Sequence, residues 1–468
     1  MKRFPFRAVP VLVALATTAA LAAFWLWQPE AGLAPRLPGT DHPPEQQATA
    51  GNPVLAGKTT PGEGKPATLP GSWPGFRGPN RDATSPEGFP LARSWPAEGP
   101  RTLWSVELGE GYAGAAVRDG KVYVMDYARE SQQSVLRCLS LEDGREIWRF
   151  GYPLPIKRNH GVTRTVPAVT EQAVVALDPK CNVLCVDAAT GALRWGLNLV
   201  HDFGTTIPPW YAGQCPLVEG NAVILAPGGS DALLVAADLA TGKILWKTPN
   251  PHGWKMTHSS IVPMEFGGKR MLVYCASGGV VGISAEDGAI LWESADWKIG
   301  IATIACPIPV DKDRIFFSGG YNAGAMMAQL AQEPDGRITV KTLFRVAAPV
   351  FGATQQTPIL SKGRLFGIRP NDGRLACLDL EGKPVWTSDA KAKFGLGPLL
   401  LADGLLYVMN DEGRLALYEA SPAKATPLAQ ADLFPGGGHE AWGPMALAGG
   451  RLLVRDFTRM ICVDVKAK

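Results

Sequence analysis

The chain has 468 residues, of which 46% are apolar, and a formal net charge of +3. A chain of this length and composition can bury a large core. The net charge is small, and the sequence has no Lys/Arg cluster and no nucleic-acid-binding motif. These features argue against nucleic acid as a partner.

Residues 1–27 have the pattern of a targeting segment. Basic residues precede an uncharged stretch, Ala8 to Trp27, of a length that can cross a bilayer as a helix. Two interpretations stay open: a membrane anchor, favoured by Trp25 and Trp27 at its end, or a signal peptide cleaved after residues 20–22. With either one, we expect the rest of the chain on the periplasmic side of the inner membrane, anchored there or released.

Two segments of unusual composition follow. Residues 28–72 are rich in Pro, Gly and Thr and have almost no large apolar side chain, so we predict a flexible tether. Residues 73–100 begin with WPGFRGP, in which Gly and Pro indicate a loop while Trp73 and Phe76 indicate packing. We expect this segment, called the clasp below, to lie as a lid or clasp against the flank of the folded domain.

From residue 101 the chain is built of repeats. In each complete copy an apolar strand ends at a Gly, which can adopt a positive φ in a hairpin turn, and a Trp follows four residues later. A single hairpin cannot bury so large a side chain, so each Trp requires the neighbouring repeat. The turn glycines are Gly144, Gly191, Gly242, Gly288 and Gly382, and the tryptophans are Trp104, Trp148, Trp195, Trp246, Trp292 and Trp386.

The spacing of the repeats predicts the fold. The first five tryptophans recur at intervals of about 44 to 51 residues, and a strand-rich repeat of that period is typical of propeller blades. Each repeat is interpreted as strands A, B, C and D, with the Trp on strand D. The chain ends just after a strand C, whereas residues 101–108 form a strand D with no strand A before it. We therefore predict an all-β, eight-bladed propeller over residues 101–468, closed by this N-terminal strand. Seven blades is the alternative if residues 305–346 do not form one.

The repeats resemble a known family. Their C-L-D-x-x-x-G-x-x-x-W core is similar to the pyrroloquinoline quinone (PQQ) repeat, and the WPGFRGPNRD opening resembles that of exported bacterial PQQ-like β-propeller proteins. The resemblance extends from Trp73 to the end of the chain. It implies the fold but leaves the function open, because the family includes quinoprotein alcohol dehydrogenases, the outer-membrane assembly factor BamB and members with no established activity.

The eight cysteines mostly occupy repeat positions. Four of them lie at one position in strand C, where we expect a small buried packing site: Cys138, Cys185, Cys377 and Cys462. Cys215 and Cys306 both precede a Pro at the start of a strand A. No C-x-x-C motif is present, so the sequence gives no zinc or c-type haem site, and we predict no metal site.

The loops from strand D of one blade to strand A of the next, called the D–A loops, carry the candidate ligand-binding residues. Such loops meet around the central channel on one face of a propeller, and a concave mouth with a few polar groups is the usual place for a ligand. The D–A loops also hold five of the six histidines. The candidates are His160, Arg164, His201, Trp210, Tyr211, His258, Gln355, Lys393, His439 and Trp442, and no catalytic residue is assigned.

Three functions remain open. We favour a monomeric, membrane-tethered binding or scaffold module whose D–A loop face takes a protein, peptide, glycan or small molecule. The resemblance also implies a PQQ-dependent quinoprotein oxidoreductase, with PQQ between a Trp and a disulfide of adjacent cysteines and with calcium. The sequence has no Cys-Cys pair and no acidic cluster in one loop, which argues against this enzyme. A BamB-like assembly factor is the third alternative, although the lipid-bearing Cys of BamB is missing here.

Overall fold

The computed structural model describes residues 17–18, 51–434, 436 and 439–467. The chain divides into two compact units, residues 1–45 and residues 46–468, and the fold below is that of the second unit. The predicted anchor at residues 1–27 lies, apart from Thr17 and Thr18, outside the described residues. Among the described helices, none has the length and apolar character that a membrane span requires.

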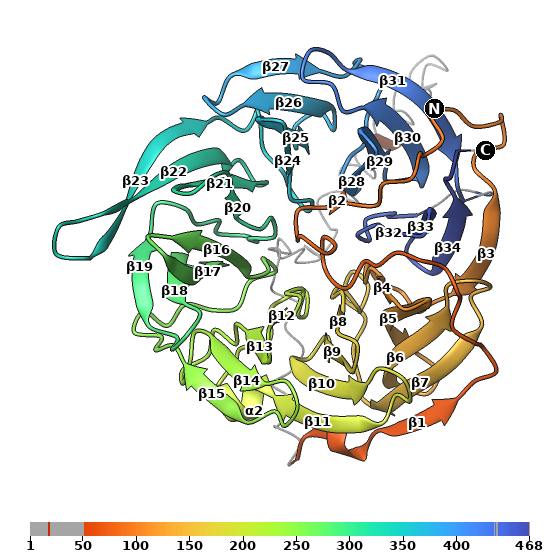
Figure 1. Ribbon diagram of the computed structural model, residues 1–468, viewed down its shortest axis with the longest axis horizontal. Helices are drawn as coiled ribbons and strands as arrows, with labels where there is room; N and C mark the ends of the chain where they lie inside the picture. Colours follow the sequence, from red (N-terminus) through yellow and green to blue (C-terminus); the bar gives the residue numbers. More distant parts are fainter. Residues whose placement is uncertain (1–16, 19–50, 435, 437–438, 468) are drawn as a thin grey trace, which may run out of the picture. The chain divides into compact units, whose positions relative to one another are not determined.

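The second unit is a ring of eight antiparallel sheets, each a blade with its strand A innermost (Figure 1). Blades 1 and 2 contain β4 (Ala116–Arg118), β5 (Lys121–Ala128), β6 (Gln133–Ser140) and β7 (Glu146–Pro153), then β8 (Ala168–Val169), β9 (Ala173–Leu177), β10 (Asn182–Asp187) and β11 (Leu193–Asn198). Blades 3 and 4 contain β12 (Leu217–Glu219), β13 (Ala222–Leu225), β14 (Val235–Asp238) and β15 (Ile244–Lys247), then β16 (Val262–Phe266), β17 (Lys269–Ala276), β18 (Gly279–Ser284) and β19 (Ile290–Ser294).

The second half of the ring repeats the pattern. Blades 5 and 6 contain β20 (Ile308–Pro309), β21 (Arg314–Gly319), β22 (Gly324–Gln332) and β23 (Ile338–Val346), then β24 (Ile359–Ser361), β25 (Arg364–Ile368), β26 (Leu375–Asp379) and β27 (Pro384–Thr387). Blade 7 contains β28 (Leu399–Ala402), β29 (Leu405–Met409), β30 (Arg414–Glu419) and β31 (Thr426–Asp432). Because residues 305–346 form blade 5, the prediction of eight blades is confirmed and the alternative of seven is wrong.

The ring closes with strands from both ends of the repeat region. Blade 8 contains β32 (Ala446–Ala448), β33 (Arg451–Arg455) and β34 (Arg459–Asp464), and its outer strand is β3 (Thr102–Glu107). β3 pairs antiparallel with β34, with Trp104 opposite Cys462. The predicted closure by the N-terminal strand is therefore confirmed. Pairing the two ends leaves no open blade edge at the closure point.

Four of the repeat tryptophans, Trp104, Trp148, Trp195 and Trp246, lie against the turn Gly of the next blade, and Phe344 takes this place against Gly382. An added Cβ on Gly242 would stand 2.7 Å from Cδ2 of Trp195, and one on Gly191 would stand 2.6 Å from Cδ2 of Trp148. Trp195 also donates from Nε1 to the Leu239 carbonyl oxygen in the next blade, at 2.9 Å. The turn Gly thus supplies both a positive φ and the space for the ring of the preceding blade.

The cysteines are all free and buried. Burial raises the pKa of the Cys185, Cys377 and Cys462 thiols to about 12, so these thiols are protonated at neutral pH. The predicted packing role in strand C is therefore confirmed for these positions.

The predicted tether is ordered over part of its length. Within residues 28–72, the structure has a 3-10 helix, η1 (Pro53–Ala56), and a strand, β1 (Lys58–Pro61), which pairs antiparallel with β7 as a fifth strand on blade 1. Val54 is fully buried. The prediction of flexibility was wrong here because the outer edge of a blade offers unpaired backbone N–H and C=O groups, and pairing with them requires no apolar side chain.

The clasp crosses the central channel instead of lying on the flank (Figure 1). Trp73 exchanges two backbone hydrogen bonds with Val117 on the inner strand of blade 1. Farther on, β2 (Thr84–Ser85) pairs parallel with β28, the inner strand of blade 7. The segment therefore packs on inner strands of the ring, not on the flank where the sequence analysis expected it. The inner edges of the blades also offer unpaired backbone groups, and the composition of the clasp cannot tell an inner edge from an outer one.

Candidate functional site

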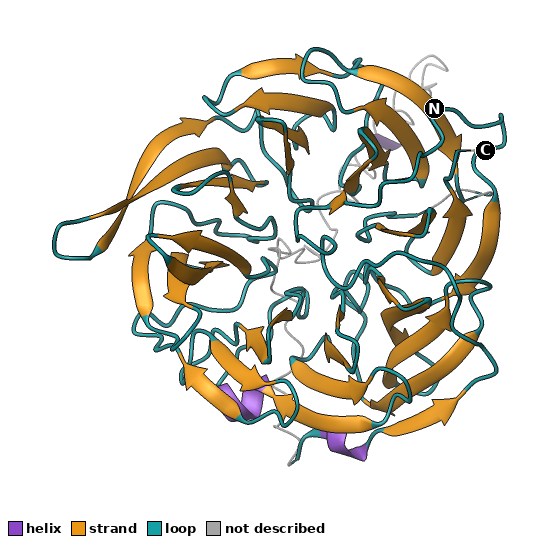
Figure 2. Cartoon of the chain, in the orientation of Figure 1, coloured by secondary structure: helices purple, strands orange, loops and turns teal. Residues whose placement is uncertain are grey.

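The D–A loops reach the channel mouth on the face away from the A–B turns, and loops fill the centre of the ring (Figure 2). Six side chains from these loops interact there: Tyr112, Arg164, Tyr211, His258, Glu440 and Trp442. They come from the loops that precede blades 1, 2, 3, 4 and 8. We call this group the mouth cluster.

An aromatic pair forms its centre. The rings of Tyr112 and Trp442 stack with centroids 5.2 Å apart and planes 23° apart. The Tyr112 hydroxyl donates a hydrogen bond to Oε2 of Glu440. Burial and the adjacent Glu440 carboxylate raise the pKa of Tyr112 well above its usual value, so the phenol keeps its proton.

The indole N–H of Trp442 is bound by the carboxylate of Asp411. Its Nε1 donates to Oδ1 of Asp411 at 2.7 Å. The same oxygen accepts the backbone N–H of Leu396 at 2.8 Å. Asp411 therefore fixes the indole and ties the loop before blade 7 to the loop before blade 8.

Arg164 covers the open side of Tyr112. Its Cζ lies 5.4 Å from the centroid of the Tyr112 ring, a cation–π distance. Its Nη2 donates to the His160 carbonyl oxygen at 2.7 Å, which folds the loop before blade 2 around the guanidinium. Burial lowers the pKa of Arg164 to about 10, and Tyr112, Tyr211 and Glu440 partly offset that effect. The side chain stays cationic at neutral pH.

His258 is a neutral imidazole. Its Nε2 lies 2.8 Å from the carbonyl oxygen of Tyr211, and since a carbonyl can only accept, Nε2 carries the proton. Burial lowers its pKa to about 4, and the positive charge of Arg164 acts in the same direction. His258 therefore joins the loops before blades 3 and 4 and adds no charge to the mouth at pH 7.

The backbone of these loops is unusual at three positions. His160, Tyr211 and Glu440 have φ values of 45°, 68° and 50°. The left-handed region is unfavourable for residues with a Cβ, and such residues are found where surrounding contacts force them, often at binding sites. Here one of the three, Glu440, presents its carboxylate to Tyr112.

The structure brings together some of the predicted residues and leaves others apart. Arg164, Tyr211, His258 and Trp442 belong to the mouth cluster. His160 contributes its carbonyl oxygen while its side chain is exposed, and His439, also exposed, contacts Phe457 with ring centroids 5.7 Å apart.

The remaining candidates lie elsewhere. His201 is 74% exposed on a short helix, α2 (Leu199–Phe203), and pairs with the adjacent Asp202 at 2.9 Å. Lys393 is exposed, and Trp210 is half-buried outside the cluster. Gln355 lines a small cavity inside the channel. These D–A loops are long, so a loop residue can lie far from the channel axis.

Sequence reasoning missed three residues of the site: Tyr112, Glu440 and Asp411. Tyr112 and Glu440 are in the D–A loops GEGYAGA and GGGHEAW, so a search of every D–A loop for aromatic and acidic side chains would have found them. Asp411 lies in the turn between β29 and β30 of blade 7. The repeat pattern gives no reason to place it beside Trp442.

A family model described as outer membrane protein assembly factor BamB matches residues 131–381, more than half of the chain. The chain belongs to this family of PQQ-like β-propellers. No curated protein matches the chain.

Solved structures of PQQ-like propellers share the fold. BamB from Moraxella catarrhalis is 15% identical and superposes with a TM-score of 0.52 over 78% of this chain and 99% of that one. A europium-containing methanol dehydrogenase is 13% identical, with a TM-score of 0.57 over 83% of this chain and 89% of that one. At this level of identity the likeness extends to the architecture alone.

Quinoprotein members of the family imply PQQ, and the channel mouth can be tested for its fit. The cavity beneath Trp442 has a volume of about 50 Å³, against about 300 Å³ at the lower end for ligand pockets. The clasp side chains Phe76 and Arg77 line it. One face of Trp442 is covered by Tyr112. Within the described residues, no group of three His, Cys, Asp or Glu lies close enough to hold a metal ion. These residues do not fit PQQ lying flat beside calcium at this mouth.

Proposed function

We propose that this PQQ-like propeller is an exported binding module that holds a partner protein on its D–A loop face. The observation that carries the proposal is the mouth cluster, in which loops preceding five blades are tied into one polar and aromatic surface. Loops on a rigid scaffold are where binding residues concentrate.

The shape of the mouth supports a protein partner more than a small ligand. The cavity beneath Trp442 is too small for a drug-sized molecule. Around the cluster lie exposed charges, such as the pair between Arg158 Nε and Glu110 Oε2 at 2.5 Å, in which Arg158 is 58% exposed. A polar rim around aromatic residues is the usual composition of a protein-binding surface.

The described N-terminal segment enters the fold along blade 1. Going back from Pro61 to Lys58, β1 runs toward the D–A loop end of β7, because Pro61 pairs with Trp148 and Lys58 with Gly151. Going forward, the segment passes to the A–B turn face, where the Ala67 N–H donates to the Gly120 carbonyl oxygen. As part of the proposal, residues 1–27 anchor the chain at the periplasmic side of the inner membrane.

Site-specific photo-crosslinking tests the proposal. The full chain would be produced in its own cells with p-benzoylphenylalanine at His160 or His439, both exposed on the D–A loop face. Matched controls carry it at Lys243 or Lys383, which are exposed on the C–D turns at the opposite face. We expect discrete protein adducts from the first pair only. Equal adducts from all four positions, or none from the D–A positions, would refute the proposal.

Two outcomes distinguish the alternatives. Saturable, calcium-dependent quenching of tryptophan fluorescence by PQQ would favour a quinoprotein oxidoreductase. An outer-membrane assembly component as the cross-linked protein would favour a BamB-like role.

A further inference from the structure

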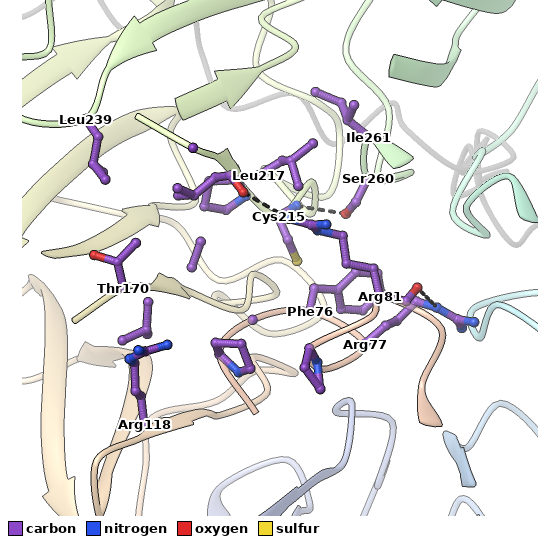
Figure 3. Close-up of a pocket in the computed structure, with 18 of the residues that line it drawn as sticks. Phe76, Arg77, Arg81, Arg118, Thr170, Cys215, Leu217, Leu239, Ser260 and Ile261 are labelled. Atoms are coloured by element: carbon purple, nitrogen blue, oxygen red, sulfur yellow. Dashed lines mark hydrogen bonds between the residues drawn. The ribbon is translucent and has the colours of Figure 1, made fainter. Parts of the chain in front are cut away.

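A second, larger cavity lies at the other mouth of the channel. Its volume is about 610 Å³, within the range of about 300–1,000 Å³ for small-molecule sites. Clasp residues 74–79 and Arg81 form one wall, and residues of blades 1 to 4, most of them on or beside the inner strands, form the others (Figure 3). We call it the clasp pocket. It exists only because the clasp lies across the channel.

The floor of the clasp pocket consists of apolar side chains and of polar groups that already have hydrogen-bond partners. Cys215 Sγ accepts the N–H of Val166 at 3.2 Å, and the Cys215 N–H donates to Ser260 Oγ at 3.0 Å. Leu217 and Ile261 lie beside them, and Phe76 faces them from the clasp (Figure 3). The clasp and the blades therefore both give the pocket apolar side chains.

The arginine side chains around the clasp pocket differ in how many N–H donors remain without a hydrogen bond. Arg77 is not available to a ligand: its guanidinium donates to the carbonyl oxygens of Thr357, Pro358, Arg81 and Asp82. Arg194 is paired with Asp187 at 2.8 Å.

Arg81 and Arg118 have donors to spare. Arg81 reaches across the pocket (Figure 3), and its hydrogen bond to the Val218 carbonyl oxygen and its ion pair with Glu219, each at 2.9 Å, both involve Nη2. Arg118 is 28% exposed and donates from Nη2 to Glu171 at 3.0 Å, while its buried Nε lies 3.6 Å from Asp119 Oδ2. In the described part of the chain, no hydrogen bond uses Nε or Nη1 of Arg81, or Nη1 of Arg118.

We propose that the clasp pocket binds a small aromatic molecule that carries carboxylate groups. The aromatic body packs against Phe76 and the apolar floor, and the carboxylates accept from Arg81 on one side and Arg118 on the other. Arginine forks match carboxylates well, and such charge-assisted bonds are stronger than neutral ones. The site is separate from the D–A loop face and does not depend on the function proposed for it.

A ligand there would also hold the clasp in place. Phe76 and Arg81 belong to the clasp, whereas Cys215, Leu217 and Ile261 belong to the blades. A molecule that contacts both sets stabilises the docked clasp by its binding free energy. We therefore expect bound ligand to slow trypsin cleavage after Arg93, which is 56% exposed near the end of the clasp.

Isothermal titration of the full chain in detergent tests this proposal. The probe is benzene-1,3,5-tricarboxylate. Benzene-1,3,5-trimethanol serves as a neutral probe of the same shape, and sulfate as an anion without an aromatic body. We expect saturable binding of the tricarboxylate only. An absence of its binding, or equal binding of the triol or of sulfate, would overturn the proposal.

Two variants locate the site. Arg81 and Arg270 both pair with Glu219, at 2.9 and 2.8 Å, but only Arg81 lines the clasp pocket. Arg81→Gln is expected to weaken the tricarboxylate about tenfold or more, as the loss of a hydrogen bond to a charged group does. Arg270→Gln should leave its affinity unchanged. Equal affinities in the two variants would place any binding elsewhere.

Discussion

The backbone N–H of Ser260 donates to Sγ of Cys306, in the next blade, at 3.2 Å. The same bond recurs around the channel: Val166 N–H to Cys215 Sγ, Cys215 N–H to Ser260 Oγ, and Cys306 N–H to Thr357 Oγ1 at 2.9 Å. A belt of side-chain acceptors therefore links blades 2 to 6, and sulfur and oxygen alternate along it. The repeat position before strand A, which the sequence assigned to Cys215 and Cys306, is an acceptor position.

The belt predicts that oxygen can replace sulfur at Cys306. Cys306→Ser keeps an acceptor for the Ser260 N–H, whereas Cys306→Ala leaves that buried N–H without one, at a cost of about 1–3 kcal/mol. We expect the Ser variant to unfold in urea at a higher midpoint than the Ala variant.

Cys377 is the control for this comparison. It is buried in strand C of blade 6, and within the described residues no hydrogen bond to its sulfur is present. There the order should reverse, because Cys377→Ser buries a hydroxyl with no partner. The same order at both positions would show that the belt bonds contribute nothing to stability.

The contacts between blades predict unequal effects of two repeat tryptophans. Trp195 is 7% exposed and bonded to Leu239, while Trp246 is only half-buried. Trp195→Ala should lower the free energy of unfolding by about 3–5 kcal/mol, as truncation of a large core aromatic does. Trp246→Ala should lower the free energy of unfolding by a smaller amount. Thermal unfolding measures both, and an unchanged melting temperature for Trp195→Ala would refute the blade contacts described above.

Arg77 should hold the clasp in the channel. It is half-buried, its pKa is lowered by desolvation, and it bonds to the carbonyl oxygens of Thr357 and Pro358, just before strand A of blade 6. Arg77→Met leaves these acceptors unpaired, so we expect a loss of about 1–3 kcal/mol and faster chymotrypsin cleavage between residues 73 and 100, because neither this substitution nor that of the control removes an aromatic cleavage site. Arg93→Met, which removes an exposed side chain 4.0 Å from Asp403, is the control and should behave as the unmodified chain. Equal proteolysis of the two variants would contradict the role of Arg77.

Two groups with shifted pKa values, the half-buried His258 and the buried Asp178, should make stability depend on pH in opposite directions. The folded state lowers the pKa of His258 from 6.5 to about 4, so the unfolded chain binds more protons between these values. The contribution of His258 to stability is therefore lost as the pH falls through that window. Burial raises the pKa of Asp178 from 3.8 to about 6, although hydrogen bonds from Tyr152 and Asn182 oppose the shift. The contribution of Asp178 is lost as the pH rises from about 3.8 to 6.

Urea unfolding at pH 4.5 and pH 7 separates the two groups. We take the free energy of unfolding of each variant relative to that of the unmodified chain. For His258→Gln this difference should be more stabilising at pH 4.5 than at pH 7. Asp178→Asn should show the reverse. The difference between the two pH values is the readout, because each substitution also changes hydrogen bonds that do not titrate. If neither variant changes the pH dependence, neither group is buried as described.

Sequence reasoning predicted best those positions at which the local structure requires one particular residue type. Gly242 and Trp195 show this: the turn requires a positive φ, the strand requires an alternating pattern, and the large ring requires a neighbour. It was weaker for the site. Arg164, Tyr211, His258 and Trp442 were predicted and meet at the mouth, yet nothing in the sequence separates them from His201 or Lys393, which lie outside the cluster.

The sequence by itself determined the repeat and predicted eight blades closed by residues 101–108, because these follow from spacing along the chain, although it left seven blades as an alternative. The tertiary structure alone decided where residues 51–85 dock and which loop side chains meet. β1 and the clasp attach mainly by backbone hydrogen bonds to blade edges, and every residue other than Pro offers the same backbone groups. Tyr112 and Glu440 are 328 positions apart. Only ring closure brings them within hydrogen-bonding distance.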